Sequence, residues 1–220
     1  MTEGGRADAA LRSVLGRSHE LGLIGDPDLD AHIDHALGFA SVADAPSRAL
    51  DLGSGGGLPG LVLARHWPTS QWVLLDGSPT RTAFLRDAVD ELELGDRVEV
   101  VTGRAEEVGR LAGRRGSVDL VVSRSFGPPA VVAECAAPFL AVGGLLVVSE
   151  PPGTVDRWDH PDALAALGLE VTVGPDGAGS DPADVVRGSY RVLGQVAPCP
   201  DRYPRRVGIP TKRPLFATEH

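Results

Sequence analysis

From about residue 48 onward, short apolar runs alternate with stretches in which apolar residues recur every three or four positions. The runs predict strands and the periodic stretches predict helices. The expected strands span residues 49–52, 72–75, 98–101, 118–122 and 144–149, and the expected helices lie near 58–66, at 81–92 and at 130–139. Because the strands are almost wholly apolar, helices should cover both faces of a parallel sheet. We therefore expect an α/β fold with a doubly wound, Rossmann-like sheet.

The segments on either side of this alternation have a different pattern. Residues 11–39 read as helical with a turn at Gly25-Asp26-Pro27, which predicts an N-terminal helical cap over residues 1–47. After residue 150 the chain is richer in Gly, Pro and Asp. It holds one expected helix at 162–167 and expected strands at 169–173 and 189–196. An antiparallel pair of these two strands would close one edge of the sheet. The domain would then span residues 48–198, and residues 199–220 would form a basic, Pro-rich tail.

A glycine-rich loop follows the first expected strand, with the sequence Asp51-Leu52-Gly53-Ser54-Gly55-Gly56-Gly57-Leu58-Pro59-Gly60. Gly53 and Gly55 would let a nucleoside ligand approach the backbone closely. The dinucleotide fingerprint G-x-G-x-x-G needs glycine at position 58, where this chain has leucine, so the spacing disfavours NAD. Asp51 adds a carboxylate suited to the ammonium group of a cofactor that carries an amino acid. A glycine-rich turn without a ligand remains the alternative.

Polar residues also follow the next two expected strands. Asp76 stands about 20 residues beyond the glycine loop, where a carboxylate that holds ribose hydroxyls belongs in such folds. Its alternative role is to cap the turn Asp76-Gly77-Ser78-Pro79. Ala105 and Glu106 follow the third strand, where backbone groups and an acidic side chain would receive an adenine edge. The alternative for Glu106 is an acidic residue favoured by the dipole at a helix start.

Composition sets limits on the class of protein. The chain has 220 residues, 42% hydrophobic and 23% charged, which fits one globular domain with appendages. A net charge of −9 weighs against a protein that coats nucleic acid non-specifically. The two cysteines and six histidines have no metal-ligand spacing beyond the lone pair His32 and His35, so no metal is expected. Without a signal-like or membrane-length apolar stretch, we expect a cytoplasmic protein with no membrane partner. We also expect a monomer.

These motifs together resemble a known family. They are the glycine loop, Leu75-Asp76 followed by Arg81 and Phe84-Leu85, Arg104-Ala105-Glu106, Ser123-Arg124-Ser125-Phe126, and the tail from Tyr203 to Leu215. The chain resembles the glucose-inhibited division protein B family, whose members methylate N7 of a guanine in 16S ribosomal RNA. The resemblance covers residues from about 48 to 215 and thins after Glu150.

The resemblance implies a class I methyltransferase that uses S-adenosyl-L-methionine. Gly53, Leu58, Ala105, Glu106 and Arg124 fall on the family's cofactor-binding positions. Asp76 follows from the wider methyltransferase fold. The implied substrate is small-subunit ribosomal RNA or the 30S particle.

Methyl transfer to guanine N7 would need positioning more than acid–base chemistry. The sulfonium is an activated donor and N7 has a free lone pair, so no general base is required. Arg124 would hydrogen-bond to cofactor or substrate, and Phe126 would stack on a base. The alternatives are a surface cation for Arg124 and a core aromatic for Phe126.

The tail carries five basic residues and no acidic one between positions 202 and 213. In an acidic chain this predicts a semi-extended arm whose Arg205, Arg206, Lys212 and Arg213 contact RNA phosphates. A Pro-rich tail strapped across its own domain is the alternative.

Two departures from the family keep other functions open. Family members usually carry Asn-Leu-Thr in the N-terminal helices, where this chain has residues 19–24 as HELGLI. They also end the fifth strand with lysine, where this chain has Glu150. An anion in place of a cation disfavours RNA phosphate and leaves a methyltransferase for a small molecule or protein as one alternative. A non-catalytic S-adenosylmethionine binder is another.

Overall fold

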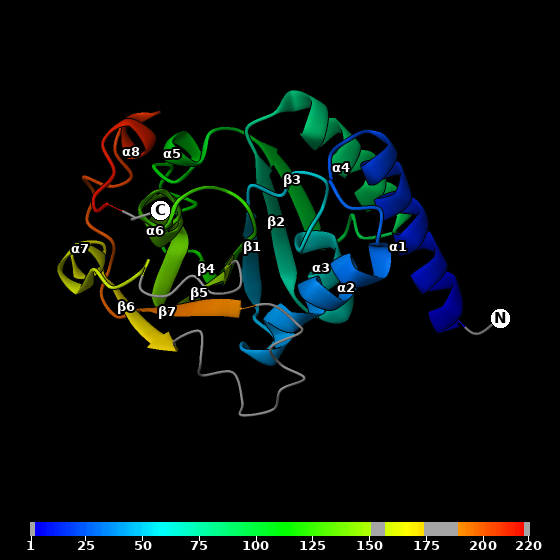
Figure 1. Ribbon diagram of the computed structural model, residues 1–220, viewed down its shortest axis with the longest axis horizontal. Coiled ribbons are helices and arrows are strands. Elements are labelled where there is room, and N and C mark those ends of the chain that lie inside the picture. The colour runs from blue at the N-terminus through cyan, green and yellow to red at the C-terminus, as the bar shows by residue number, and fades with distance from the viewer. Residues whose placement is uncertain (1–2, 151–156, 174–188, 218–220) are drawn as a thin grey trace.

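The computed structural model describes residues 3–150, 157–173 and 189–217, and its centre is a seven-stranded sheet (Figure 1). The strands are β1 (Arg48–Leu52), β2 (Gln71–Asp76), β3 (Val98–Thr102), β4 (Val118–Ser123), β5 (Leu140–Glu150), β6 (Leu169–Val173) and β7 (Ser189–Gln195). Their order is β3-β2-β1-β4-β5-β7-β6. The first five strands are parallel, and β7 runs antiparallel to both β5 and β6. This arrangement confirms the predicted parallel sheet and its antiparallel closing pair.

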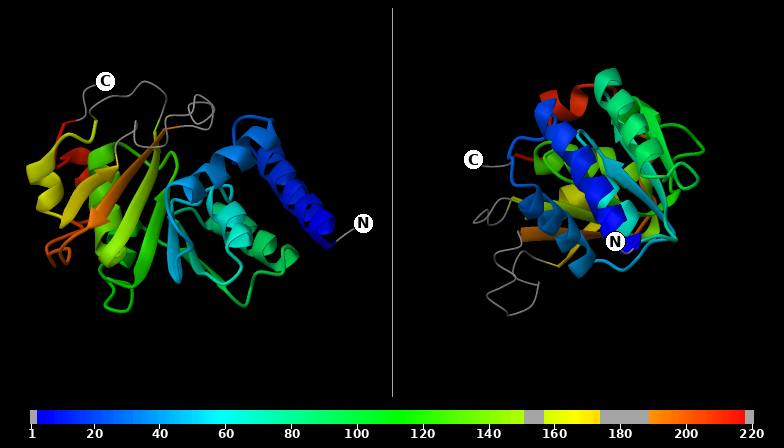
Figure 2. Two further views of the ribbon diagram at one scale, coloured as in Figure 1. Left: turned by 90° about the horizontal axis from the view of Figure 1, so that it is seen from below. Right: turned by 90° about the vertical axis from the view of Figure 1, so that its right-hand side faces the viewer.

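Helices cover both faces of the sheet, as a doubly wound fold requires. The helices are α1 (Glu3–Glu20), α2 (Leu29–Gly38), α3 (Gly60–His66), α4 (Pro79–Glu91), α5 (Ala105–Val108), α6 (Pro129–Ala136), α7 (Pro161–Ala165) and α8 (Ile209–Lys212), with 3₁₀ turns η1 (Phe39–Ser41) and η2 (Ala137–Phe139). One buried apolar cluster joins the sheet to α1–α4, and a second joins it to α5–α7 and the tail. The N-terminal helices lie at the opposite end of the molecule from α7 and α8 (Figures 1 and 2).

Two predicted elements differ from the observed ones for local reasons. The helix expected at 130–139 ends as an α-helix at Ala136 and continues as the turn η2. Pro138 explains the change, because proline lacks the backbone N–H that an α-helix needs. The strand expected at 144–149 begins earlier, at Leu140, and its pairing with β4 shifts register between Val118 and Leu120. Gly143, with φ +89°, lies in this irregular stretch.

The N-terminal cap rests on the glycine loop. The Ser18 hydroxyl at the end of α1 donates to the Gly56 carbonyl over 2.9 Å. The Tyr190 hydroxyl, from β7, donates to the His35 carbonyl in α2 over 2.5 Å. Asp28 caps the start of α2 through a hydrogen bond from the Ala31 amide. The N-terminal helical cap is therefore packed against both the glycine loop and the sheet.

The C-terminal tail lies across the opposite face. Arg115 donates to the carbonyl oxygens of Cys199 and Tyr203, each over 2.7 Å. The rings of His160 and Phe216 stack with centroids 4.5 Å apart. These contacts support the alternative of a tail strapped across its own domain.

Candidate functional site

The glycine loop turns away from β1 in a conformation that only glycines adopt readily. Gly53, Gly55 and Gly57 have φ values of +78°, +52° and +98°. The amides of Gly53 and Ser54 both donate to the Leu75 carbonyl, over 2.8 and 3.0 Å, so the loop is fixed to β2. A side chain at Gly60 would place its Cβ 2.5 Å from both Asp51 Oδ2 and a Leu74 methyl. The end of the loop therefore also requires glycine.

Two adjoining hollows flank this loop at the carboxyl ends of the parallel strands. The first, called the strand-end hollow, has a volume of about 390 Å³ and is lined by residues that include Asp76, Arg104, Ala105 and Phe126. The second, the cap-side hollow, has about 250 Å³ and is lined by residues that include His32, Gly55, Leu58 and Arg124. Both are lined by Gly53, Arg81 and Ser125. Ligands of open α/β sheets bind at this edge.

Asp76 lies in the strand-end hollow and also braces the loop. It is 6% exposed, and its Oδ2 accepts from the Gly55 amide over 3.0 Å while its Oδ1 accepts from the Ser78 amide over 2.8 Å. Arg81 stands 3.7 Å from Oδ2. A carboxylate has about four acceptor positions, so these contacts leave room for ribose hydroxyls. The turn-capping role and the expected binding role are compatible.

Asp51 lies behind the loop and lines neither hollow. It is fully buried, and its Oδ2 accepts from the Gly60 amide over 3.0 Å. Burial raises the pKa of Asp51 to about 7. This position does not support the expected contact with a cofactor ammonium. Asp51 instead holds the start of α3 against the end of β1.

Ala105 and Glu106 have separate positions although they are adjacent in sequence. Ala105 lines the strand-end hollow, as expected for a residue beside an adenine. Glu106 is 3% exposed, and its Oε1 accepts from the Gly208 amide over 3.0 Å and from Arg104 over 3.2 Å. Burial alone would raise the pKa of Glu106, but these hydrogen bonds outweigh it and lower the pKa. Glu106 therefore joins the tail to the wall of the hollow.

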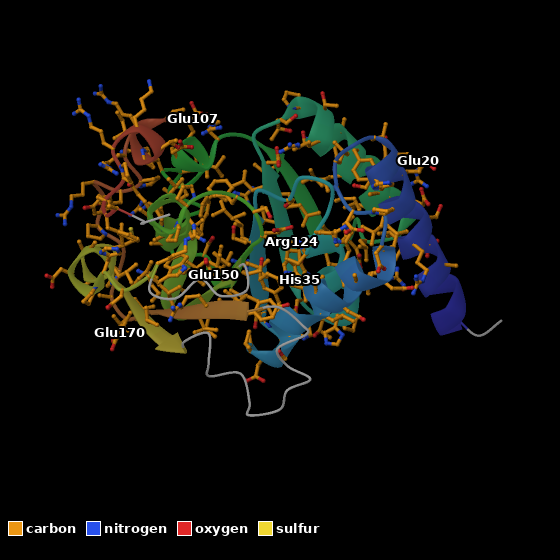
Figure 3. All side chains as sticks on the ribbon, in the orientation of Figure 1. Glu20, His35, Glu107, Arg124, Glu150 and Glu170 are labelled. Carbon is orange, nitrogen blue, oxygen red and sulfur yellow. The ribbon has the colours of Figure 1, made fainter. Side chains whose placement is uncertain are left out.

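Arg124 and Phe126 leave the end of β4 and reach the two hollows. Arg124 Nη2 lies 2.9 Å from His32 Nδ1, and its Nη1 is buried without a hydrogen-bond partner among the described residues. In Figure 3 Arg124 and His35 are labelled next to each other at the centre of the molecule. Phe126 packs on the loop, since a Cβ at Gly53 would lie 2.5 Å from its ring. Phe126 also contacts the second apolar cluster, so it is partly a core residue.

One of the four tail cations that we expected to bind RNA is used inside the protein. The Arg205 amide donates to Oε1 of the fully buried Glu134 over 2.7 Å, and its side-chain Nε lies 2.9 and 3.1 Å from the two carboxylate oxygens. The carboxylate raises the pKa of Arg205. Arg206, Lys212 and Arg213 are exposed. These three remain candidates for phosphate contacts, whereas Arg205 anchors the tail.

Glu150 is also held by neighbours. It is 8% exposed, and its carboxylate accepts from Arg157 Nη1 over 2.9 Å and from the indole N–H of Trp158 over 2.8 Å. Arg157 offsets its charge. The replacement of the family lysine by Glu150 therefore does not present a bare anion to a substrate and does not weigh against RNA.

Sequence reasoning missed two features of the site. From sequence, His32 stands out only as half of the lone histidine pair with His35, yet it lines the cap-side hollow and contacts Arg124. His32 and His35 are three residues apart, which places both on one helix face. That spacing was the sequence feature that could have pointed to His32. Glu134 gave no signal, because its partner lies 71 positions away.

Neither a metal site nor a membrane span was found in the described part of the chain. No group of three or more His, Cys, Asp or Glu residues there is arranged to hold a metal ion. No helix in the same ranges is both long and apolar enough to cross a membrane.

The strand order, the glycine loop and the polar strand ends together define the Rossmann-like fold of class I methyltransferases. Solved structures share this fold. Cofactor-bound Rv0187 from MTB is 23% identical with a TM-score of 0.58, over 86% of this chain and 90% of that one. The O-methyltransferase from Bacillus cereus in complex with SAH is 16% identical with a TM-score of 0.55, over 84% and 89%.

Sequence comparison then identifies the family. Residues 19–152 match the model of the family described as rRNA small subunit methyltransferase G (GidB). Proteins named ribosomal RNA small subunit methyltransferase G are similar over most of the chain. The one from Moorella thermoacetica is 34% identical over 83% of this chain and 76% of its own length, and the one from Deinococcus radiodurans is 38% identical over 79% and 68%. The chain belongs to this family, and it is a methyltransferase whose cofactor is S-adenosylmethionine.

Proposed function

We propose that this protein transfers the methyl group of S-adenosylmethionine to N7 of a guanine in 16S ribosomal RNA. The observation that carries the proposal is the extent of the family match. Residues 19–152 include every residue that lines the two hollows. The part of the chain that resembles ribosomal RNA methyltransferases is therefore the part that would hold both cofactor and target base.

The residues of the two hollows fit the parts of this cofactor. Asp76 would accept from the ribose hydroxyls, and Ala105 would lie beside the adenine. Gly53 and Gly55 would let the ligand approach the loop backbone. Arg124 retains an N–H donor that a carboxylate or carbonyl oxygen would satisfy. When bound, the cofactor supplies a methyl group already activated on a sulfonium.

The protein's remaining task is to hold the guanine in line with that methyl group. Guanine N7 carries a lone pair and no proton, so no residue need remove one. Phe126 would stack on the base at the edge of the strand-end hollow. Arg124 and Phe126 are accordingly proposed as positioning groups, and no general base is assigned.

The tail supports an RNA substrate through three cations. The bond from the Gly208 amide to Glu106 places α8 beside the wall of the strand-end hollow, and Figure 1 shows α8 next to α5. Exposed Arg206, Lys212 and Arg213 would contact RNA phosphates there, together with Arg104 at the rim. We infer that the protein acts as a monomer in the cytoplasm, on the small subunit or its RNA.

Changing Arg206, Lys212 and Arg213 together to alanine should weaken binding to small-subunit RNA and make it less dependent on salt. Each lost phosphate contact on single-stranded RNA should reduce the slope of log affinity against log salt by about 0.7, giving about 2 for all three. The measurement is RNA binding across a salt titration.

Two controls accompany this titration. Arg48→Ala removes a cation from the amino ends of the strands, away from both hollows, and should leave the slope unchanged. Calorimetry with S-adenosylmethionine should give wild-type affinity for the triple variant. An unchanged slope in that variant would remove the tail from the RNA-binding surface.

A further inference from the structure

His32 connects the N-terminal cap to the site through both nitrogens of its ring. It lies in α2 and is 8% exposed. Its Nδ1 lies 2.9 Å from Arg124 Nη2, and its Nε2 lies 3.0 Å from the Asp26 carbonyl oxygen. A guanidinium can only donate, so Nδ1 must accept. The hydrogen then resides on Nε2, which donates to the carbonyl, and the two contacts together fix one neutral tautomer.

The contact with His32 uses one end of the Arg124 guanidinium and leaves the other end available. Nη2 is held by His32, whereas Nη1 is buried and makes no hydrogen bond within the described ranges. An unpaired buried donor is costly, which points to a ligand that completes it. Arg124 lines the cap-side hollow together with His32 and Gly55, so such a ligand has space beside the glycine loop.

Arg124 carries the positive charge of this cluster, and the buried Asp51 carboxyl is the acidic group near it. Burial and the nearby Arg124 lower the pKa of His35 to about 4, so that ring is neutral at neutral pH. Burial raises the pKa of Tyr190, which is also neutral. Because Nη1 of Arg124 can only donate, the ligand atom that fits beside it is an acceptor, and an oxygen meets that need.

We propose that His32 is a positioning residue for methyl transfer, which holds Arg124 so that Nη1 meets an acceptor oxygen in the cap-side hollow. This inference rests on the proposed function, because it assigns a role within the same site. The acceptor is either the carboxylate of the cofactor's amino acid or the O6 oxygen of the target guanine. Both are oxygens at the same donor, and binding and turnover distinguish them.

Two amide variants separate the two contacts of the ring. In His32→Asn, the side-chain oxygen lies near the place of Nδ1 and still accepts from Arg124. In His32→Gln, the longer amide reaches the place of Nε2 and leaves Arg124 Nη2 without its acceptor. We expect the asparagine variant to keep turnover within about threefold of wild type and the glutamine variant to lose about tenfold or more.

The readouts are turnover on small-subunit RNA, calorimetric affinity for S-adenosylmethionine, and the midpoint of thermal unfolding. Weaker cofactor binding in the glutamine variant assigns Nη1 to the cofactor carboxylate. Unchanged cofactor binding with lower turnover assigns it to the base. Equal losses in both variants, following a common loss of stability, would overturn the proposal, as would wild-type behaviour of both.

A double-mutant cycle with Arg124→Gln tests whether His32 acts through Arg124. If it does, His32→Gln should cause little further loss once Arg124 is gone. Independent, additive losses would contradict the proposal. Should the wild-type protein methylate no small-subunit RNA, a difference in cofactor affinity between the asparagine and glutamine variants would still support the role of His32 while the proposed substrate fails.

Discussion

Replacing Gly55 by leucine should abolish measurable binding of S-adenosylmethionine while the protein stays folded. Gly55 lines the cap-side hollow, and apart from the Gly53 carbonyl oxygen at 3.7 Å, nothing nearby would meet a Cβ there. The new side chain would therefore enter the space proposed for the ligand. Forcing a ligand past such a side chain costs about 3 kcal/mol or more, which is at least about a hundredfold in affinity.

Gly116 provides a matched control for the backbone strain of this substitution. Its φ is +56° against +52° for Gly55, and the nearest atom to its Cβ would be a carbonyl oxygen at 3.8 Å. It precedes β4 and lines neither hollow. Gly116→Leu should show a similar drop in thermal stability and wild-type affinity by calorimetry. Wild-type affinity in Gly55→Leu would place the cofactor elsewhere.

Replacing Arg205 by alanine should lower the free energy of unfolding by about 3 kcal/mol, because it leaves the fully buried Glu134 without its counter-charge. The Arg205 amide would still donate to Glu134. The loss of stability should therefore lie at the lower end of the range for broken buried ion pairs. Denaturant unfolding measures it.

Arg206→Ala is the control, since it removes the adjacent exposed cation and should change stability by less than about 0.5 kcal/mol. Equal stabilities of the two variants would show that the ion pair does not anchor the tail. The result also bears on RNA experiments, because a loss of RNA binding on changing Arg205 would report a damaged tail rather than a phosphate contact.

The alternation of strands and helices could be predicted from sequence because each element is long enough to show its own period. This alternation also predicts where each strand ends. Those ends place Asp76, Ala105 and Arg124 at one edge of the sheet. The helices α5 and α8 were not predicted, since each has four residues and shows no periodic apolar face.

Asp51 lies behind the glycine loop because of the way side chains alternate along β1. Its neighbours Leu50 and Leu52 pack into the cluster beneath α5–α7, while Ala49 packs into the cluster beneath α1–α4. Because side chains alternate along a strand, Asp51 points to the same face as Ala49, where the Gly60 amide meets it. Alternation alone would have directed Asp51 toward α3.

The roles of Arg205 and His32 depend on contacts with residues far away in the sequence, which no local pattern reveals. A basic stretch in an acidic chain predicted one role for all four cations, but Glu134, 71 residues earlier, takes Arg205. The hydrogen-bond partner of His32 is Arg124, 92 residues later in the chain. Such pairs form only when helices and strands pack together. The sequence predicts the order of these elements along the chain but not which of their side chains meet.

The most direct test of this account is a comparison of small-subunit ribosomal RNA from cells with and without the gene, read at each guanine for N7 methylation. One guanine should lose its methyl group in the deletion strain. Purified protein with S-adenosylmethionine should restore it on RNA or 30S particles from that strain, and the Gly55→Leu protein should not. Identical N7 methylation at every guanine in the two strains would contradict the proposed function.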